Sequence, residues 1–269
     1  LVRKNQASVA ASLAAGAFSE LFDVDGQGLD TIGDLVRQEG WPVEHMASRE
    51  YGNEPAGAWN LALGQRLKRL MEAVNPGAVV FDGTHPYNGL LIARRAFPQT
   101  PFIWSRRAMW KPGAVSTALK LADYFNLVLE PGEVATAVDQ GPTTTDTSAM
   151  RVGPVMFLDA DEFLDRAEAR LRLGLDPDRT AVLVQLGAGN INDTRSLTHD
   201  VLEALRAIPD VQICVAVPSI SRSDLSLPED VTRLALFPLS KYAHAFDFGV
   251  SASGYNSYHE AIAAGLPTI

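Results

Sequence analysis

The sequence has little of what marks a secreted, repetitive or membrane-spanning protein. It contains a single cysteine, Cys214, in 269 residues. A lone cysteine excludes a disulfide framework and suits a reducing compartment. No stretch approaches the ~20 consecutive apolar residues of a membrane span, and no low-complexity tract or fixed-period repeat is present. These absences lead us to expect a globular, cytoplasmic protein.

Basic residues are also outnumbered. Lysine and arginine total 23 against 32 acidic residues, which gives a formal net charge of −9. The long-range field of such a chain repels nucleic acid and anionic membranes. We expect no nucleic-acid partner, and peripheral membrane contact stays open. A phosphate ligand would have to be held by local geometry.

The residues that are present favour two domains. The chain is 46% hydrophobic, enough for two cores at this length. Strand-like apolar runs alternate with helical segments, which is the pattern of parallel sheets covered by helices. We predict an α/β protein of two tandem Rossmann-like, doubly wound domains, residues 1–154 and 155–269. Because Leu1 is not a methionine and Ile269 ends an apolar run, we expect both domains to be cut short.

The spacing of apolar residues predicts the individual elements. The first domain is expected to contain two helices and two short strands within residues 2–47, helices over 59–74 and 89–97, and strands over 78–81, 101–104 and 124–129. The second is expected to contain helices over 161–173, 196–208, 241–245 and 257–264, and strands over 181–186, 211–217, 234–237 and 247–251. Ligands of such sheets bind at the carboxyl ends of the strands. We expect the site there, between the domains.

The strongest motif runs from Phe248 to Glu260 and continues to Pro267. A buried strand delivers small residues, 251–254, to the start of a helix. Backbone N–H groups can converge there on an anion with no side chain in the way. The helix end offers a phosphate about half a positive charge. Glu260 lies about one turn further on, where a carboxylate can accept hydrogen bonds from ribose hydroxyls. The alternative is an ordinary solvated glutamate.

Residues 237–267 resemble the donor-binding half of the peptidoglycan N-acetylglucosaminyltransferase family, glycosyltransferase family 28 with the two-domain GT-B fold. In that family a strand, a small-residue turn, a helix bearing glutamate and a Gly-Leu-Pro segment recur, and Asp247 at the strand start also fits. The resemblance implies that the turn binds the UDP diphosphate, the glutamate binds ribose, and the backbone of the segment from Phe237 through Leu239 to Ser240 reads the base. The implied donor contacts in the turn and helix are Ser253, Gly254, Tyr255, Asn256, Ser257 and Glu260.

A second glycine-rich loop follows the strand that begins near Val182. Its residues Gly187, Ala188, Gly189 and Asn190 are similar to the loop that opens the donor domain of the same family, and are expected to approach the sugar diphosphate. A Gly-x-Gly after a strand is also how a dinucleotide-binding fingerprint begins. That alternative lacks the third glycine, since position 192 is Asn192. It also lacks an acidic residue at the end of the following strand.

Polar residues that could take part in chemistry also follow two strands of the first domain. Asp82, Thr84 and His85 follow the strand 78–81, where Asp82 or His85 could act as the base that takes the proton of an acceptor hydroxyl. Each could equally be a structural loop residue, and the base favoured in the resembled family lies in an earlier loop. Arg106 and Arg107 stand between two tryptophans after the strand 101–104. They could grip an acceptor phosphate or carboxylate, or form an interdomain salt bridge over a core tryptophan.

Two further patterns suggest no site. Asp159 and Asp161 match an Asp-x-Asp metal motif but stand just before a predicted helix, where aspartate is a favoured cap. The five histidines show no ligand-like spacing, so no metal or cofactor is expected. We predict a glycosyltransferase that uses a UDP-sugar and an unknown acceptor without a metal. The alternatives are a nucleotide-sugar 2-epimerase of the same fold and a non-catalytic nucleotide-sugar-binding subunit.

Overall fold

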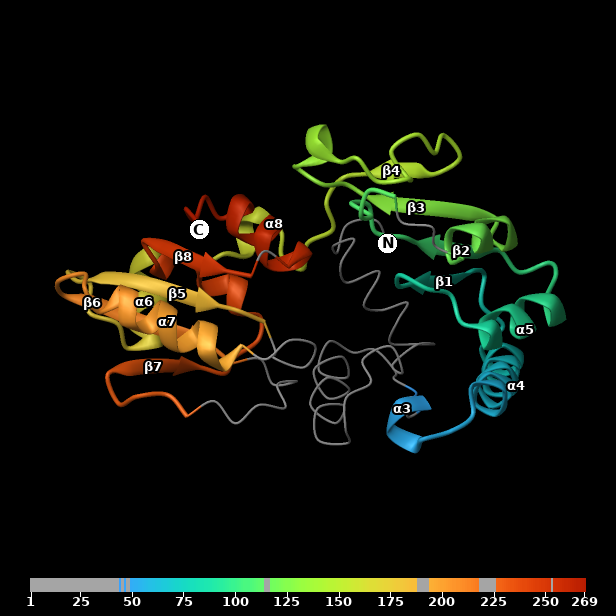
Figure 1. Ribbon diagram of the computed structural model, residues 1–269, viewed down its shortest axis with the longest axis horizontal. Coiled ribbons are helices and arrows are strands. Elements are labelled where there is room, and N and C mark those ends of the chain that lie inside the picture. The colour runs from blue at the N-terminus through green and yellow to red at the C-terminus, as the bar shows by residue number, and fades with distance from the viewer. Residues whose placement is uncertain are drawn as a thin grey trace. The chain divides into compact units, whose positions relative to one another are not determined.

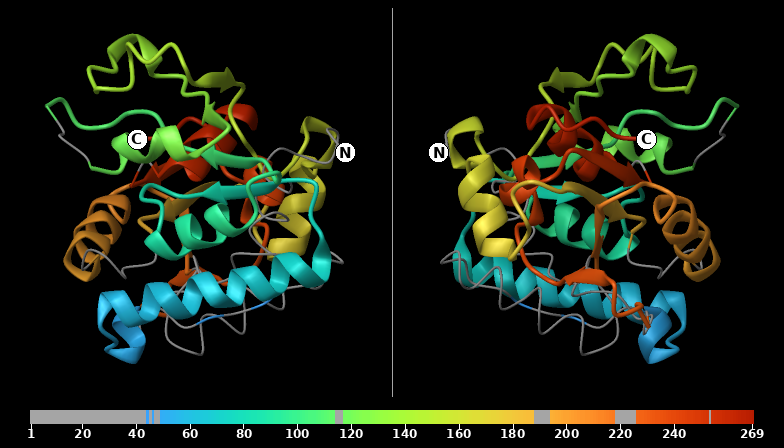
Figure 2. Two further views of the ribbon diagram at one scale, coloured as in Figure 1. Left: turned by 90° about the vertical axis from the view of Figure 1, so that its right-hand side faces the viewer. Right: turned by 90° about the vertical axis from the view of Figure 1, so that its left-hand side faces the viewer.

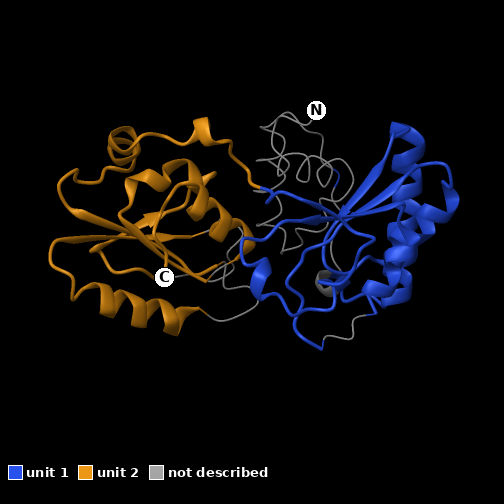
Figure 3. Ribbon diagram, turned by 90° about the horizontal axis from the view of Figure 1, so that it is seen from above, with its two compact units in different colours: residues 1–2, 6–155 blue, residues 3–5, 156–269 orange. Residues whose placement is uncertain are grey.

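The computed structural model describes residues 44, 46, 49–113, 117–187, 194–217, 226–252 and 254–269. Figure 1 shows their helices and strands. The elements expected within residues 2–47 lie outside this part of the chain. The described residues divide into two compact units, of which the first ends at Val155 and the second is Met156–Ile269 (Figure 3).

Unit 1 is built on a parallel sheet. Its strands are β1 (Val79–Asp82), β2 (Phe102–Ser105), β3 (Leu127–Pro131) and β4 (Met150–Val152). They lie in the order β1-β2-β3-β4, and each pairs in parallel with the next. Because the spatial order follows the chain order, the described part of this sheet grows in one direction only.

Helix α4 (Ala56–Val74) supplies the longest apolar stripe of unit 1. Trp59, Leu63, Leu67 and Met71 recur every fourth residue and are all buried, so they lie on one face of the helix. They share a core with the aromatic residues of β1 and β2. The helix ends at Asn75, whose φ of 46° places it in the left-handed region that closes many helices.

Helix α5 (Asn88–Ala96) packs closely against α4 (Figure 2). A Cβ added at Gly89 would come within 2.6 Å of the Asn60 carbonyl oxygen, and one at Gly64 within 2.8 Å of Ile92. The Gly89 N–H also donates to the Asn60 side chain at 2.8 Å. The two glycines therefore permit this approach. The remaining elements of unit 1 are short: α3 (Arg49–Gly52), η2 (Leu119–Tyr124) and η3 (Thr136–Val138).

Unit 2 has a parallel sheet whose order reverses. Its strands are β5 (Thr180–Gln185), β6 (Val211–Ala216), β7 (Val231–Leu234) and β8 (Phe248–Ser251). They lie in the order β7-β6-β5-β8, and every pair is parallel. The chain steps outward from β5 through β6 to β7, then returns to the other side of β5. The point of reversal lies between β5 and β8.

Both faces of this second sheet are covered. Leu183 of β5 packs on one face with residues of α6 (Arg166–Leu173) and η5 (Leu239–Ala245). Its neighbours Val182 and Val184 pack on the other face with α7 (Arg195–Leu205). Alternation of this kind is expected of a strand whose successive side chains point to opposite faces. The prediction of a doubly wound parallel sheet is confirmed.

An ion-pair cluster fixes the amino ends of β5 and β8. One carboxylate oxygen of Asp247 accepts from the Ala181 N–H and from Arg170 Nη2, both at 2.8 Å. The other accepts from Arg166 Nη2 at 2.6 Å. Arg170 is buried and also donates to the Ala245 carbonyl at 2.9 Å. Asp247 therefore links α6 to both strands, at the end of the sheet opposite the glycine turns.

Two predicted elements have different bounds in the structure. The strand expected over 234–237 is β7, Val231–Leu234, because the apolar residue Leu236 packs against the core from the connection between β7 and η5 and not from a strand. The helix expected over 161–173 begins at Arg166. Asp165 caps it by accepting from the Glu168 N–H at 2.9 Å, while residues before it form a separate short turn, η4 (Ala160–Glu162).

Strand β4 was not predicted. Its three residues are Met150, Arg151 and Val152, of which the first two are exposed. They therefore lack the buried apolar pattern by which a strand is recognised in sequence. What fixes this strand is its pairing with β3.

Candidate functional site

The two glycine turns predicted in the second domain follow neighbouring strands. β5 and β8 pair as far as Gln185 and Ser251, and the Ala252 N–H continues the pairing by donating to the Gln185 carbonyl at 3.1 Å. Because the strand order reverses between them, their carboxyl ends flank the topological switch point at which open α/β sheets bind ligands. Gly187, just past β5, has a φ of +86°, a conformation that favours glycine.

Helix α8 (Tyr255–Ala263) begins directly after β8. Its N-cap residue is Gly254, with φ −62° and ψ 143°, and no side chain among the described residues caps the helix. A Cβ added at Gly254 would meet nothing within 4 Å. The first turn, with Tyr255, Asn256 and Ser257, is thus preceded by a residue that leaves space in front of the backbone. An anion can approach the amide groups of such a helix start closely.

A hollow lies within unit 2 beside this helix start. Its polar lining consists of Gln185, Ser240, Ser251, Ser257, Glu260 and Thr268. Gln185 and Ser251 are the last residues of β5 and β8, so the hollow opens at the switch point. Leu239 contributes to its apolar wall.

Glu260 is the ionisable side chain of this hollow. Burial raises the pKa of its carboxyl from 4.5 to about 7, and a hydrogen bond from the Ser240 hydroxyl opposes that rise. Burial acts in this direction because a poorly solvated site disfavours the charged form. A carboxyl whose pKa is displaced this far, in a hollow at the switch point, is a candidate for ligand binding.

The structure brings several predicted donor residues together and leaves others apart. Leu239, Ser257 and Glu260 line the hollow, and Gly187 and Gly254 lie at the two turns beside it. Phe237 does not line it: its ring is 52% exposed and stacks edge-on against Phe157, with centroids 4.9 Å apart. Tyr255 and Asn256 belong to the first turn of α8 but do not line the hollow. The other predicted contacts, Ala188, Gly189, Asn190 and Ser253, lie outside the described residues.

Sequence reasoning missed Gln185, Ser251 and Thr268 as lining residues, and considered Ser240 only for its backbone. Gln185 carried a signal, because it is a polar residue at the end of an otherwise apolar strand. Thr268 carried none, since its place in the hollow depends on the Gly249–Thr268 bridge.

In unit 1, the predicted base candidates follow β1. Asp82 is the last residue of that strand and is partly buried, whereas Thr84 and His85 are exposed in the loop. The Trp104 indole N–H donates to the Gly83 carbonyl at 2.7 Å and so fixes where this loop begins. Asp82 and His85 stay predictions as bases, and Thr84 stays a prediction as an acceptor-side residue.

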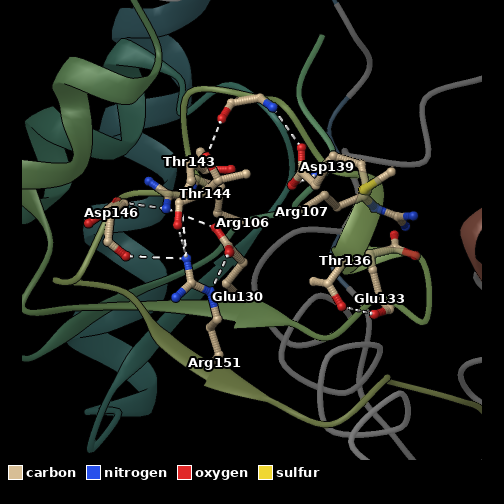
Figure 4. A network of polar contacts seen from close by, with 12 residues as sticks. Arg106, Arg107, Glu130, Glu133, Thr136, Asp139, Thr143, Thr144, Asp146 and Arg151 are labelled. Atoms are coloured by element: carbon tan, nitrogen blue, oxygen red, sulfur yellow. Dashed lines mark hydrogen bonds and ion pairs between the residues drawn. The ribbon is translucent and has the colours of Figure 1, made fainter. Parts of the chain in front are cut away.

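The two predicted acceptor-side arginines differ in their exposure to solvent. Arg107 is exposed, but Arg106 is only 1% exposed and is held by internal ion pairs. Its Nη2 donates to Glu130 at 2.9 Å and to Asp146 at 2.8 Å. Figure 4 shows this network, in which Arg151 of β4 also donates to Glu130, at 3.2 Å.

The network fixes a loop over the carboxyl ends of β2 and β3. The Ser148 hydroxyl and Arg106 both favour the ionised form of Asp146, and the pKa of that carboxyl falls to about 2. Arg151 donates to the Thr143 and Thr144 carbonyls at 3.1 and 3.2 Å. Arg106 is therefore held by Glu130 and Asp146, both of which belong to unit 1. Arg106 and Arg107 stay predictions as acceptor-side residues.

The other sequence patterns have structural explanations where they are described. Asp159 caps η4 in a reciprocal arrangement with Glu162. Within the described ranges, no group of three or more histidine, cysteine or acidic residues is placed to hold a metal ion. Cys214 is buried, and burial raises the pKa of its thiol to about 11. Across the same ranges, every helix falls short of the length and apolarity needed to cross a membrane.

No protein-family model matches the chain, and no curated protein matches it. Solved structures do. Spinosyn rhamnosyltransferase SpnG in complex with thymidine diphosphate is 17% identical, with a TM-score of 0.54 over 86% of this chain and 68% of its own. Acinetobacter baumannii MurG is 15% identical, with a TM-score of 0.51 over 98% of this chain and 74% of its own.

A third similar structure is a putative UDP-N-acetylglucosamine 2-epimerase from Listeria monocytogenes, 12% identical, with a TM-score of 0.53 over 89% of this chain and 67% of its own. At these identities the likeness establishes the fold. The chain has the two-domain GT-B fold of glycosyltransferases, as its resemblance to family 28 implied. The similar proteins named here include a glycosyltransferase and an epimerase of nucleotide sugars, and all three are longer than this chain.

Proposed function

We propose that this protein transfers a sugar from a UDP-linked donor to an acceptor hydroxyl, and that unit 2 binds the donor. The observation that carries the proposal is the convergence, at the switch point between β5 and β8, of the Gly187 turn, the uncapped start of α8 and the hollow around Glu260. The fold supports it, since SpnG, which shares it, was solved with a nucleoside diphosphate.

In this proposal the start of α8 holds the diphosphate. The space that a Cβ at Gly254 would occupy is open, and the helix dipole adds roughly 1 to 2 kcal/mol for an anion in a partly buried setting. The acidic net charge of −9 makes such a local device necessary. Negative charge grows on the diphosphate as the donor bond breaks, so the same amides stabilise the transition state.

The transfer itself needs one bond formed and one broken. The acceptor oxygen attacks the anomeric carbon of the sugar, and the bond from that carbon to the diphosphate oxygen breaks, with its electron pair leaving on UDP. The acceptor proton passes to a base, for which Asp82 and His85 are the candidates. No metal is required, because the helix amides carry the stabilisation.

Glu260 supplies the most direct test. Its carboxylate is proposed to accept hydrogen bonds from the ribose hydroxyls, and a hydrogen bond to a charged group contributes about 1.5 to 3 kcal/mol. Glu260→Ala should weaken UDP binding about tenfold or more by calorimetry. Glu203→Ala, which removes an exposed carboxylate on α7, is the control and should leave the affinity unchanged. Equal affinity in both variants would remove the ribose assignment.

The likeness to an epimerase gives a second candidate, in which the enzyme isomerises the nucleotide sugar with no acceptor. Incubation of the protein with UDP-N-acetylglucosamine alone separates the two. An isomeric UDP-sugar in the product mixture would favour the epimerase. Binding without turnover, with and without a panel of acceptors, would favour a non-catalytic subunit.

A further inference from the structure

Glu260 has one partner in the hollow that comes from a different element. Ser240 lies in the first turn of η5, two residues after Pro238, and is only 9% exposed. It lines the same hollow as Glu260, where its hydroxyl can donate to the Glu260 carboxyl and so lowers the pKa of that group. η5 and α8 pack against each other, and Ser240 and Glu260 line the same hollow. The contact therefore joins the connection after β7 to the helix that follows β8.

No other ionisable group lines the hollow among the described residues. The remaining titratable side chains of η5 and α8 lie outside its lining, namely Lys241, Tyr242, His244, Tyr255, Tyr258 and His259. β5 and β8 contribute only uncharged residues, among them Gln185 and Ser251. The carboxylate thus lies in a poorly solvated place with a hydroxyl as its described partner and no cation beside it.

We propose that Ser240 is a positioning residue of the donor site, whose hydroxyl orients the Glu260 carboxylate in the hollow and keeps it ionised for the ribose hydroxyls of the nucleotide. The inference rests on the proposed function, because it takes Glu260 as the ribose ligand. It adds a device that sets the pH range of donor binding.

The physical reason is the difference between the two protonation states. Ribose hydroxyls donate best to an ionised carboxylate, whereas burial favours the neutral acid. The Ser240 hydroxyl stabilises the ionised form and so offsets part of the effect of burial. Without it, ionisation of Glu260 requires a higher pH, and the nucleotide binds well only above that pH.

The experiment measures the carboxyl directly in the full chain. Carbon-13 NMR of glutamate carboxyl groups, with the Glu260 signal identified by its loss in Glu260→Gln, gives the titration midpoint without any ligand. Ser240→Ala should raise this midpoint, and Ser240→Thr, which keeps the hydroxyl, should restore it. Thr268→Val removes another hydroxyl of the same hollow and should leave the midpoint where it is.

Calorimetry with UDP across pH completes the test. Ser240→Ala should bind UDP about tenfold more weakly near neutral pH, and should approach wild-type affinity at alkaline pH, where Glu260 is ionised in both proteins. If Ser240→Ala only disturbed the local structure, the affinity for UDP would fall equally at every pH, and the proposed role of Ser240 would be wrong.

The outcomes separate the two levels of the argument. An unchanged Glu260 midpoint in Ser240→Ala, with UDP binding that still depends on Glu260, would overturn the role of Ser240 and leave the proposed function standing. A wild-type protein that does not bind UDP at all would overturn the proposed function, and this inference with it.

Discussion

The two units contain the same kind of sheet but differ at its carboxyl edge. In unit 1 the described strands follow in chain order, and the edge is closed by ion pairs that bury Arg106 between Glu130 and Asp146. In unit 2 the order reverses between β5 and β8, and the edge carries two glycine turns and a hollow.

The two units also differ in the partners of one carboxylate each, Glu130 in unit 1 and Glu260 in unit 2. Glu130 is 4% exposed and has ion pairs to two arginines. Glu260 has a hydroxyl partner and, among the described residues, no salt bridge. A carboxylate neutralised by internal cations is tied to the structure, whereas one that is poorly solvated and unneutralised can gain from a ligand. The comparison therefore favours the edge of unit 2 for the proposed donor site, and the ion pairs around Arg106 for stabilising the edge of unit 1.

The largest expected effect tests the structural role of Arg106. Arg106→Met removes one partner of a buried ion pair and leaves Glu130 with Arg151 alone. The free energy of unfolding should fall by about 3 kcal/mol, measured by urea denaturation. The double variant Arg106→Met, Glu130→Met should recover most of that loss, because it removes both buried charges. Unchanged stability combined with lost transfer activity would instead return Arg106 to acceptor binding.

The second prediction concerns the start of α8. Aspartate at position 254 can cap the helix, since φ −62° and ψ 143° are extended backbone, but it places a negative charge where the diphosphate is proposed to bind. Gly254→Asp should weaken UDP binding about 100-fold by calorimetry and leave uridine binding unchanged. Gly254→Asn, a cap of similar size without the charge, is the matched control. Equal affinities for UDP in the two variants would place the diphosphate elsewhere.

The third prediction follows from the pKa of Glu260. Because that pKa is raised from 4.5 to about 7 on folding, the folded state binds this proton more tightly than the unfolded state. The carboxyl therefore destabilises the fold progressively as pH rises from 4.5 to about 7, and by a constant amount above. Glu260→Gln stays neutral, so its stability advantage should open over this range and reach about 1 to 3 kcal/mol. Urea denaturation of the wild type and of Glu260→Gln at several pH values across this range measures the difference. A difference that does not change with pH would contradict the prediction.

The smallest effect is expected from an exposed ion pair. Arg206 and Asp230 form two hydrogen bonds at 2.9 and 2.8 Å on the surface of unit 2. Exposed pairs of this kind contribute little, because solvent screens them. Arg206→Met should leave the denaturation midpoint unchanged, in contrast to Arg106→Met. A large loss of stability in Arg206→Met would mean that exposed ion pairs also stabilise this protein strongly.

Apolar periodicity predicted the sheets well. The buried stripe of α4 and the apolar runs of β1, β2, β5 and β6 all lie where the sequence placed them, because burial on one or both faces leaves a clear pattern. It failed at β4, whose residues are mostly exposed, and at β7, where Leu236 and Phe237 continue the apolar run beyond the strand.

The sequence predicted the candidate site where backbone conformation defines it. Gly187 and Gly254 were found because glycine marks turns and close approaches. The role of Ser240 was not, since it depends on a contact across 20 residues between η5 and α8. The sequence could not show that Arg106 is buried and Arg107 is not. Arg106 is buried because it pairs with the buried Glu130, and that contact spans 24 residues of the chain.

The anchoring of Asp247 has a consequence for the opposite end of its strand. Its carboxylate accepts a hydrogen bond from the Ala181 N–H of β5, at the amino end of β8. The two strands therefore cannot shift along each other without breaking that bond and the salt bridges around it. The spacing of the two glycine turns is thereby set by the fold itself. A preorganised site loses less conformational entropy on binding, so under the proposed function a residue that does not contact the donor would contribute to its affinity.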